Sequence, residues 1–222
     1  MRTDDSVFME ALRAAPIIPV LTVADVEDAA PLAQALARAG VRVAEVTLRT
    51  PAALDVIRRM RDSAEHLLIG AGTVLDASAA RASMAANATF LVTPGTTPAL
   101  TAALAELDVL AIPGVASVSE AMARREEGFA LLKLFPAEIA GGPPLLRALA
   151  GPLPDLKFIP TGGISLASVV AYLALPNVAG VGGTWIVTPT DIAARNWSAI
   201  EDAARAALAQ VAVSPRATRA PE

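Results

Sequence analysis

The chain has 222 residues, a formal net charge of -4 and a pI near 5.1, which fits one large domain or two small ones. The acidic balance argues against a nucleic-acid partner, because such a partner requires a basic face. The absence of Cys excludes disulfides, thiolate nucleophiles and thiolate metal sites. The single His, His66, leaves little scope for a His-based metal site or a Ser–His–Asp triad.

The hydrophobic fraction of 54% and the mean hydropathy of +0.51 are typical of a membrane protein or of an α/β fold with strands buried on both faces. The longest weakly polar stretch, residues 169–187, is interrupted by Tyr172, Pro176 and Gly180. A membrane span would need roughly 20 uninterrupted apolar residues. The first ten residues, MRTDDSVFME, are too polar and acidic for a signal peptide. We therefore expect a cytoplasmic protein that binds neither membranes nor nucleic acid.

In chain order, the pattern predicts a helix over about residues 6–14 and then eight short strand-like runs, at 17–22, 43–48, 67–71, 89–92, 109–112, 130–135, 156–160 and 178–183. Between the runs lie Ala-rich segments of helical length. Alternating strands and helices indicate a parallel sheet with right-handed crossovers. Eight such units predict an α/β fold, a closed (β/α)8 TIM barrel with one extra N-terminal helix. The rival, an open doubly wound sheet, lacks a G-x-G-x-x-G loop after its first strand.

Local signals mark helix boundaries. A Ser117–Glu120 capping box predicts one helix start, and further starts are expected at Thr50-Pro51, Asp76 and Ser165. Gly40 stands where a helix should stop. No linker is visible, so we expect residues 1–212 to form a single domain, followed by a disordered tail at 213–222.

Lys133 is the sharpest chemical signal. It lies in the apolar run ALLKLF, and strand alternation places Leu131, Lys133 and Phe135 on one face. Burying an unpaired ammonium is costly, so this setting favours the neutral amine, the form that attacks a carbonyl to make a Schiff base. The alternative is an ordinary strand-end lysine whose charged group extends to water.

Glu45 lies in a second apolar run, VRVAEVTLRT, where strand alternation puts Val43, Glu45, Thr47 and Arg49 on one face. A carboxylate in such a strand must pair or change its protonation state. A structural ion pair between Glu45 and Arg49 is one interpretation. With Lys133 in the same barrel, the other is an amine for covalent catalysis and a carboxylate for proton transfer. Arg49 would then clamp a substrate carboxylate.

Two Gly pairs suggest an anion site. Thr161-Gly162-Gly163 precedes an expected helix, and Gly182-Gly183-Thr184 ends the eighth strand. Glycine lets backbone N–H groups approach a phosphate closely, and the loops after the seventh and eighth strands are the usual phosphate location in these barrels. Each pair alone is equally compatible with a simple turn.

Eight segments keep a familiar order across about residues 15–187: Pro19-Val20, EVTLRT at 45–50, GAGTV at 70–74, TPG at 93–95, IPGV at 112–115, KLFPAE at 133–138, PTGGI at 160–164 and GGTW at 182–185. Through them the chain resembles the 2-keto-3-deoxy-6-phosphogluconate (KDPG) aldolase family, which includes bifunctional 4-hydroxy-2-oxoglutarate (KHG) aldolases. The resemblance implies a metal-free, cofactor-free class I aldolase that cleaves KDPG to pyruvate and glyceraldehyde 3-phosphate, and a homotrimer.

The resemblance also implies roles for individual residues. Lys133 would form the Schiff base and Glu45 would accept and donate protons. The remaining roles are substrate binding by Arg49, Thr73, Pro94, Phe135 and Thr161, and phosphate binding by Gly162, Gly163, Gly183 and Thr184. Thr184 departs from the expected Ser and adds a methyl group to the phosphate pocket. Thr161 matches the phosphogluconate-type enzymes, since the galactonate-type relatives should carry an apolar residue there.

Three other functions remain open from the sequence. The same chemistry could act on KHG or on 2-keto-3-deoxy-6-phosphogalactonate. A barrel that binds sugar phosphates without catalysis would keep the Gly pairs but would not need Glu45 and Lys133 in apolar strands. A phosphate-binding isomerase could use Glu45 as a base without covalent chemistry.

Overall fold

The computed structural model of the protein describes residues 3–212, so the predicted disorder of residues 213–222 lies outside the described residues. The strands are β1 Ile17–Leu21, β2 Val43–Thr47, β3 Leu68–Gly72, β4 Phe90–Val92, β5 Leu110–Ile112, β6 Gly114–Val115, β7 Leu131–Leu134, β8 Lys157–Pro160 and β9 Val181–Gly183. The helices are α1 Thr3–Ala14, α2 Ala29–Arg38, α3 Ala53–Ser63, α4 Ala77–Ala85, α5 Pro98–Glu106, α6 Val118–Glu126, α7 Gly142–Leu149, α8 Val169–Leu173, α9 Pro189–Ala193 and α10 Trp197–Ala212, with a 3-10 turn at Val26–Asp28.

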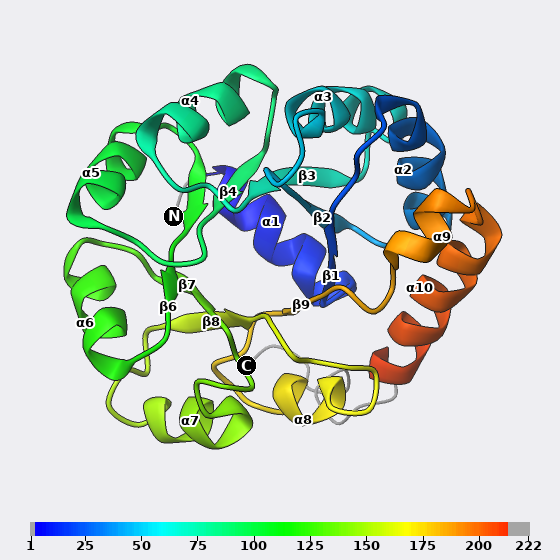
Figure 1. Cartoon of the computed structure of the whole chain (residues 1–222). Coiled ribbons are helices and arrows are strands. Elements are labelled where there is room, and N and C mark those ends of the chain that lie inside the picture. Colours follow the sequence, from blue (N-terminus) through cyan, green and yellow to red (C-terminus); the bar gives the residue numbers. More distant parts are fainter. Residues whose placement is uncertain (1–2, 213–222) are drawn as a thin grey trace.

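The strands form a closed parallel barrel. Their order is β5-β4-β3-β2-β1-β9 in one segment and β6-β7-β8 in the other. Bridges between Phe158 and Val178 and between Thr161 and Gly182 join β8 to the β9 side. Figure 1 shows helices α2 to α10 in a ring around the strands, with α1 lying across one end of the barrel. The predicted (β/α)8 barrel and its extra N-terminal helix are thus confirmed.

The fifth expected strand is divided into β5 and β6 by Pro113. Proline has no N–H and cannot donate to a ladder, so regular pairing stops there. The Pro113 carbonyl still accepts a hydrogen bond from the Lys133 N–H at 2.9 Å, which keeps β7 in register. The strand predicted over residues 109–112 corresponds to β5, and the short β6 beyond the proline was not predicted.

Two apolar layers stabilise the fold, and the strands alternate between them. Ile18 and Val43 face the barrel interior, while their neighbours Ile17 and Ala44 face the helices. The interior cluster consists of Phe8, Leu12, Ile18, Val43, Phe90, Val92, Leu110, Ile112, Leu131, Ile159 and Ala179. Phe8 of α1 meets Phe90 edge-on at a centroid distance of 4.9 Å. The extra helix therefore closes the amino-terminal end of the barrel, leaving the other end for chemistry.

The predicted helix signals had mixed outcomes. The Ser117–Glu120 capping box and the Asp76 cap are present, and Gly40 follows α2 with a φ of +93°, a conformation that favours glycine. Thr50 is not the cap of α3, because its hydroxyl donates to the Val23 carbonyl and the helix begins at Ala53. Ser165 is not the cap of α8, because a turn intervenes before Val169.

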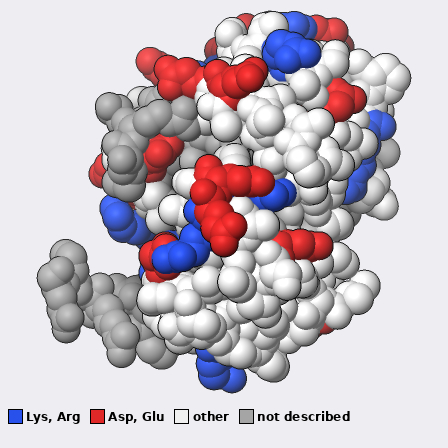
Figure 2. Space-filling view, turned by 90° about the vertical axis from the view of Figure 1, so that its left-hand side faces the viewer, with Lys and Arg blue, Asp and Glu red and all other residues white. Residues whose placement is uncertain are grey.

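The surface carries mixed charge. On the side of the barrel drawn in Figure 2, acidic and basic side chains alternate with broad uncharged areas, and no continuous basic surface is visible on that side. Within residues 3–212, no helix is both long and apolar enough to cross a membrane.

Candidate active site

The centre of the site is a buried pair formed by Lys133 on β7 and Glu45 on β2. Lys133 Nζ lies 3.1 Å from Glu45 Oε1 and 3.5 Å from Oε2, with the two residues 5% and 4% exposed. Both point into the barrel, since their strand neighbours Leu131 and Val43 belong to the interior cluster. Taking such a pair out of water costs several kcal/mol per ion, so the pair contributes little to the stability of the fold. Its burial therefore points to a purpose other than stability. Glu45 pairs with Lys133, and the alternative Glu45–Arg49 ion pair is wrong.

The neighbouring strand leaves space for the Glu45 carboxylate. Gly72 ends β3 and pairs in register with Thr47 of β2. A Cβ atom at Gly72 would overlap Glu45 Oε1. In the sequence this glycine stands out only as part of the GAGTV segment at 70–74. Its position at the end of the strand next to that of Glu45 was the signal that could have indicated its role.

Phe135 and Thr47 complete the surroundings of the pair. The Phe135 ring centroid lies 5.2 Å from Lys133 Nζ, within the range of a cation–π contact. Thr47 is fully buried on the face that carries Glu45, and its hydroxyl donates to the Leu21 carbonyl at 2.9 Å. The site therefore combines an amine, a carboxylate and an aromatic wall in surroundings from which water is largely excluded.

The position of Arg49 differs from the one that the sequence predicted. Strand β2 ends at Thr47, and Arg49 occupies the following turn with an exposed side chain. It therefore does not share a strand face with Glu45, because the alternation stops where the strand does. Its guanidinium makes no hydrogen bond or ion pair with any other residue in the described range 3–212. A role as a carboxylate clamp stays a prediction.

Thr73 and Pro94 follow β3 and β4 at the same end of the barrel. Thr73 has a φ of +59°, which is uncommon for a residue other than glycine and is often found at functional sites. Pro94 is held by its surroundings, since a Cβ at Gly114 would overlap its carbonyl group. The Thr93 hydroxyl accepts a hydrogen bond from the Gly114 N–H at 2.9 Å. The end of β4 is thus fixed against the start of β6.

The Gly pairs lie side by side, because Thr161 and Gly182 form a bridge between their strand ends. Thr161 is buried, and its hydroxyl occupies the space that a Cβ at Gly182 would need. Gly162 and Gly163 have φ values of +100° and +81°, which few other residues adopt. Gly183 is buried against the Trp185 ring, whereas Thr184 is exposed.

Glu45 and Lys133 stand within strands, and the other nine predicted residues end or follow strands whose carboxyl ends meet at one end of the barrel. The structure brings Glu45 and Phe135 next to Lys133 and joins the two Gly-rich loops. In the described part of the chain, no three His, Cys, Asp or Glu side chains are grouped in a way that could hold a metal ion.

A (β/α)8 barrel with a buried lysine–carboxylate pair at the carboxyl ends of its strands defines this protein as an aldolase-type enzyme. The model of the "KDPG and KHG aldolase" family matches residues 8–203. The chain belongs to this family.

Individual relatives agree with this assignment. The 2-dehydro-3-deoxy-phosphogluconate aldolase of Pseudomonas aeruginosa is 46% identical over 200 residues, covering 90% of this chain and 91% of that protein. The KHG/KDPG aldolase of Escherichia coli is 42% identical, covering 89% and 92%. The crystal structure of KDPG aldolase from Legionella pneumophila, with pyruvate captured as a covalent carbinolamine, superposes with a TM-score of 0.87 at 44% identity, covering 90% and 97%.

Proposed function

We propose that this protein is a class I aldolase that cleaves 2-keto-3-deoxy-6-phosphogluconate to pyruvate and glyceraldehyde 3-phosphate. The observation that carries the proposal is the buried Lys133–Glu45 pair at 3.1 Å, which sets a nucleophilic amine beside a group that can exchange protons. The names of the Pseudomonas and Escherichia relatives, and the carbinolamine in the Legionella structure, support the same chemistry.

In the proposed mechanism, the neutral Lys133 amine attacks the C2 carbonyl of the substrate, and loss of water with uptake of one proton gives a protonated imine. Glu45 accepts the proton of the C4 hydroxyl as the C3–C4 bond breaks. The electron pair of that bond moves into the imine, leaving an enamine and free glyceraldehyde 3-phosphate. Glu45 then returns a proton to C3, and water hydrolyses the imine to release pyruvate and restore the lysine.

The other predicted residues would bind the substrate. Arg49 would pair with its carboxylate, with Thr73 and Pro94 beside the pyruvate portion and Phe135 and Thr161 along the chain. The phosphate would lie against the loops of Gly162-Gly163 and Gly183-Thr184. The left-handed glycines support this role, because such turns direct successive N–H groups toward an anion.

Borohydride trapping tests the proposal. Reduction in the presence of pyruvate should add one pyruvate-derived mass to the peptide that contains Lys133, and Lys133→Ala should lose both the adduct and turnover. Lys157 provides an internal control, because it is the other lysine of the chain and its Nζ donates to the Pro176 carbonyl away from the site. An adduct on Lys157, or none, would contradict the covalent mechanism.

A second substrate deserves testing, because the Escherichia coli relative is named for both KHG and KDPG. KHG presents the same 2-keto, 4-hydroxy arrangement without a phosphate. In the proposed mechanism the Lys133–Glu45 pair would act only on the part that the two substrates share, so we expect cleavage of KHG at a lower efficiency.

We propose further that the protein is a cytoplasmic homotrimer. A phosphorylated sugar acid does not cross membranes unaided, which supports cleavage in the cytoplasm. Several large apolar side chains are exposed, namely Leu75, Ile139, and Val118 and Met122, which lie about one helical turn apart on α6. They supply surface suited to self-association. Sedimentation equilibrium would measure the mass of the assembly.

A further inference from the structure

The segment after β7 joins the lysine strand to the Gly162–Gly163 loop. The Ala137 N–H donates to the Thr161 carbonyl at 2.8 Å, and the Glu138 N–H donates to the Gly162 carbonyl at 3.1 Å. The β7–β8 ladder ends at Leu134 and Pro160, and these two hydrogen bonds connect the loops that follow the two strands. Glu138 lies five residues after Lys133.

The stem of the Glu138 side chain packs directly on the loop. A Cβ atom at Gly163 would lie 2.6 Å from Glu138 Cγ, closer than real atoms approach. Gly163 is therefore required for two reasons, its φ of +81° and the side chain lying across it. Glu138 thus contacts the loop through its backbone and through its side chain.

The Glu138 carboxylate reaches the helix beyond the loop. The hydroxyl of Tyr172, on α8, donates to Glu138 Oε1 at 2.8 Å. Tyr172 is fully buried, and burial together with the Glu138 contact raises its pKa far above the ordinary value of 10.0. Both effects favour the protonated phenol, which is the donor of this hydrogen bond. Gly142 leaves room for this contact, since a Cβ there would lie 3.2 Å from the Tyr172 oxygen.

We propose that Glu138 and Tyr172 are positioning residues that hold the Gly162–Gly163 loop in its phosphate-binding shape and so determine the preference for a phosphorylated substrate. The inference rests on the proposed function. Glu138 holds the loop at Gly162 and Gly163, and through Tyr172 it holds the helix into which the loop leads. Neither side chain bonds to Lys133 or Glu45, whose side-chain hydrogen bonds are to each other.

Electrostatics supports this assignment. A carboxylate beside a phosphate site repels the dianion, and the repulsion grows as water is excluded. The Tyr172 hydroxyl binds one Glu138 oxygen and holds the carboxylate toward α8. Without that hydroxyl, the carboxylate would be free to turn toward the loop, and the loop would lose its connection to α8.

Kinetics on two substrates tests the inference. Tyr172→Phe retains the ring and removes the hydroxyl, so the core stays filled. Because misplacing a binding group by about 1 Å can cost up to about a hundredfold, we expect KM for KDPG to rise about tenfold or more. The rate on unphosphorylated KHG and the borohydride trapping of pyruvate on Lys133 should be unchanged. Glu138→Ala should reproduce this result. In the double variant, KM for KDPG should rise no further than in either single variant.

Two further variants separate positioning from general damage. Glu138→Gln keeps an oxygen that accepts from Tyr172, so it should retain most of the preference for the phosphorylated substrate. Thr101→Val is the matched control, because it also removes a buried hydroxyl, one that donates to the Pro98 carbonyl on α5. Thr101→Val should lower the melting temperature without changing the ratio of kcat/KM for KDPG to kcat/KM for KHG.

Several outcomes would overturn the inference. Equal losses of kcat/KM on KDPG and KHG would mean that the two residues have a structural role only. An unchanged KM for KDPG in Tyr172→Phe and Glu138→Ala would mean that they have no role in binding the phosphorylated substrate. If the unmodified protein traps pyruvate but shows no preference for the phosphorylated substrate, the inference fails and the aldolase chemistry stands. If it traps no pyruvate at all, the proposed function itself fails.

Discussion

Gly70 and Gly72 stand two residues apart on β3, and their missing side chains serve different purposes. A Cβ at Gly72 would overlap the Glu45 carboxylate, whereas one at Gly70 would overlap the Phe90 ring in the barrel interior. Gly72→Ala should therefore displace the carboxylate and lower turnover by about a hundredfold, the order expected for a misplaced catalytic group. Gly70→Ala should instead lower the free energy of unfolding by about 1–3 kcal/mol through overpacking.

The two variants are compared by turnover per folded molecule and by chemical denaturation. Gly70→Ala serves as the control, since it adds the same methyl group to the same strand. Normal turnover in Gly72→Ala would show that Glu45 does not need its present position.

Glu45→Gln should separate covalent chemistry from proton transfer. Glutamine keeps the shape of the side chain but cannot accept a proton, while imine formation needs only the amine and an accessible carbonyl. Borohydride should still trap pyruvate on Lys133. Aldol cleavage, and exchange of pyruvate methyl protons with heavy water, should fall about 10²- to 10⁴-fold, the usual contribution of a general acid–base.

Glu65→Gln is a suitable control for that experiment, because Glu65 is exposed in the loop before β3. Near-normal exchange in a folded Glu45→Gln variant would assign the proton shuttle to another group. Loss of trapping as well would indicate that Glu45 mainly controls the ionisation of Lys133.

At the residue scale, strand alternation correctly predicted that Lys133 shares a strand face with Leu131 and Glu45 with Val43, because all four stand within strands. Which face points into the barrel became clear only from the structure. Strand alternation failed for Arg49, since the period of two applies only up to Thr47, where β2 ends. The partner of Glu45 was not determined by local sequence either. Lys133 lies 88 positions away, and the closed barrel brings the two together.

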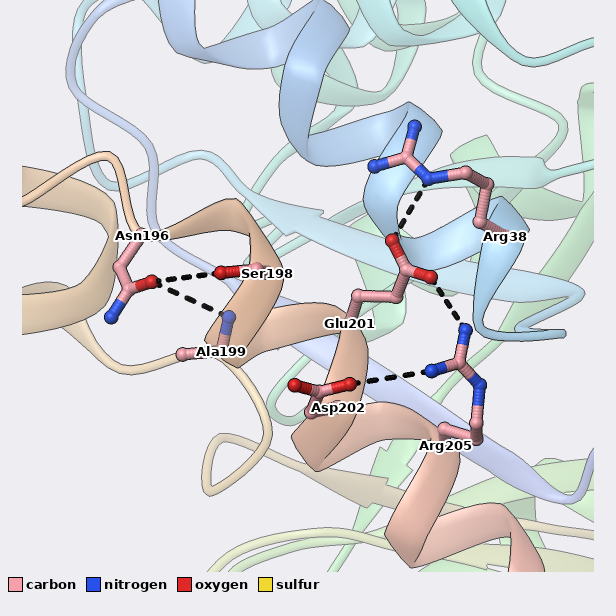
Figure 3. A network of polar contacts seen from close by, with 7 residues as sticks. All are labelled: Arg38, Asn196, Ser198, Ala199, Glu201, Asp202 and Arg205. Carbon is pink, nitrogen blue, oxygen red and sulfur yellow. Dashed lines mark hydrogen bonds and ion pairs between the residues drawn. The ribbon is translucent and has the colours of Figure 1, made fainter.

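At the element scale, α10 is joined to α2 by an exposed network of charges (Figure 3). Glu201 accepts from Arg38 of α2 at 2.8 Å and from Arg205 of its own helix at 2.5 Å. The hydrogen bonds from these two guanidiniums lower the pKa of Glu201 below its ordinary value of 4.5. A depressed folded-state pKa gives stability that is present above the unfolded value and is lost as the pH falls through the folded one.

Glu201→Gln should therefore lower the melting temperature at neutral pH, and the difference from the unmodified protein should vanish as the pH falls well below 4.5. Added salt should also reduce this difference in melting temperature, because the network is exposed. Asp202→Asn is the control, since its contact with Arg205 at 3.3 Å lies within α10. A melting difference that persisted in acid would argue against a charge-based link.

Elements with strong local signals were predicted best. The capping box of α6 and the glycine after α2 marked true boundaries, because both act through neighbouring residues. Thr50 and Ser165 misled, since their polar groups are used in tertiary and turn contacts instead. The division at Pro113 could have been read from proline chemistry, but the apolar run on its amino-terminal side concealed it.

At the scale of the whole molecule, the barrel determines what the site can hold. The parallel strands bring the amine of β7 and the Gly-rich ends of β8 and β9 to the same end of the fold. The order of strands and helices was enough to predict this arrangement. Distances across the barrel were not predictable, because they depend on closure and packing.

This arrangement leads to a prediction about the substrate as a whole. If the loops at Gly162-Gly163 and Gly183-Thr184 bind a phosphate, removing that group forfeits hydrogen bonds to a dianion, each worth about 1.5–3 kcal/mol. Since 1.36 kcal/mol corresponds to a tenfold change in rate, losing one or two such bonds predicts a kcat/KM about two orders of magnitude lower for the dephosphorylated sugar acid. Steady-state assays of both compounds measure the ratio. Borohydride trapping of pyruvate, which carries no phosphate, is the control and should proceed normally in either case. Equal efficiency on the two sugar acids would mean that the glycine pairs only turn the chain.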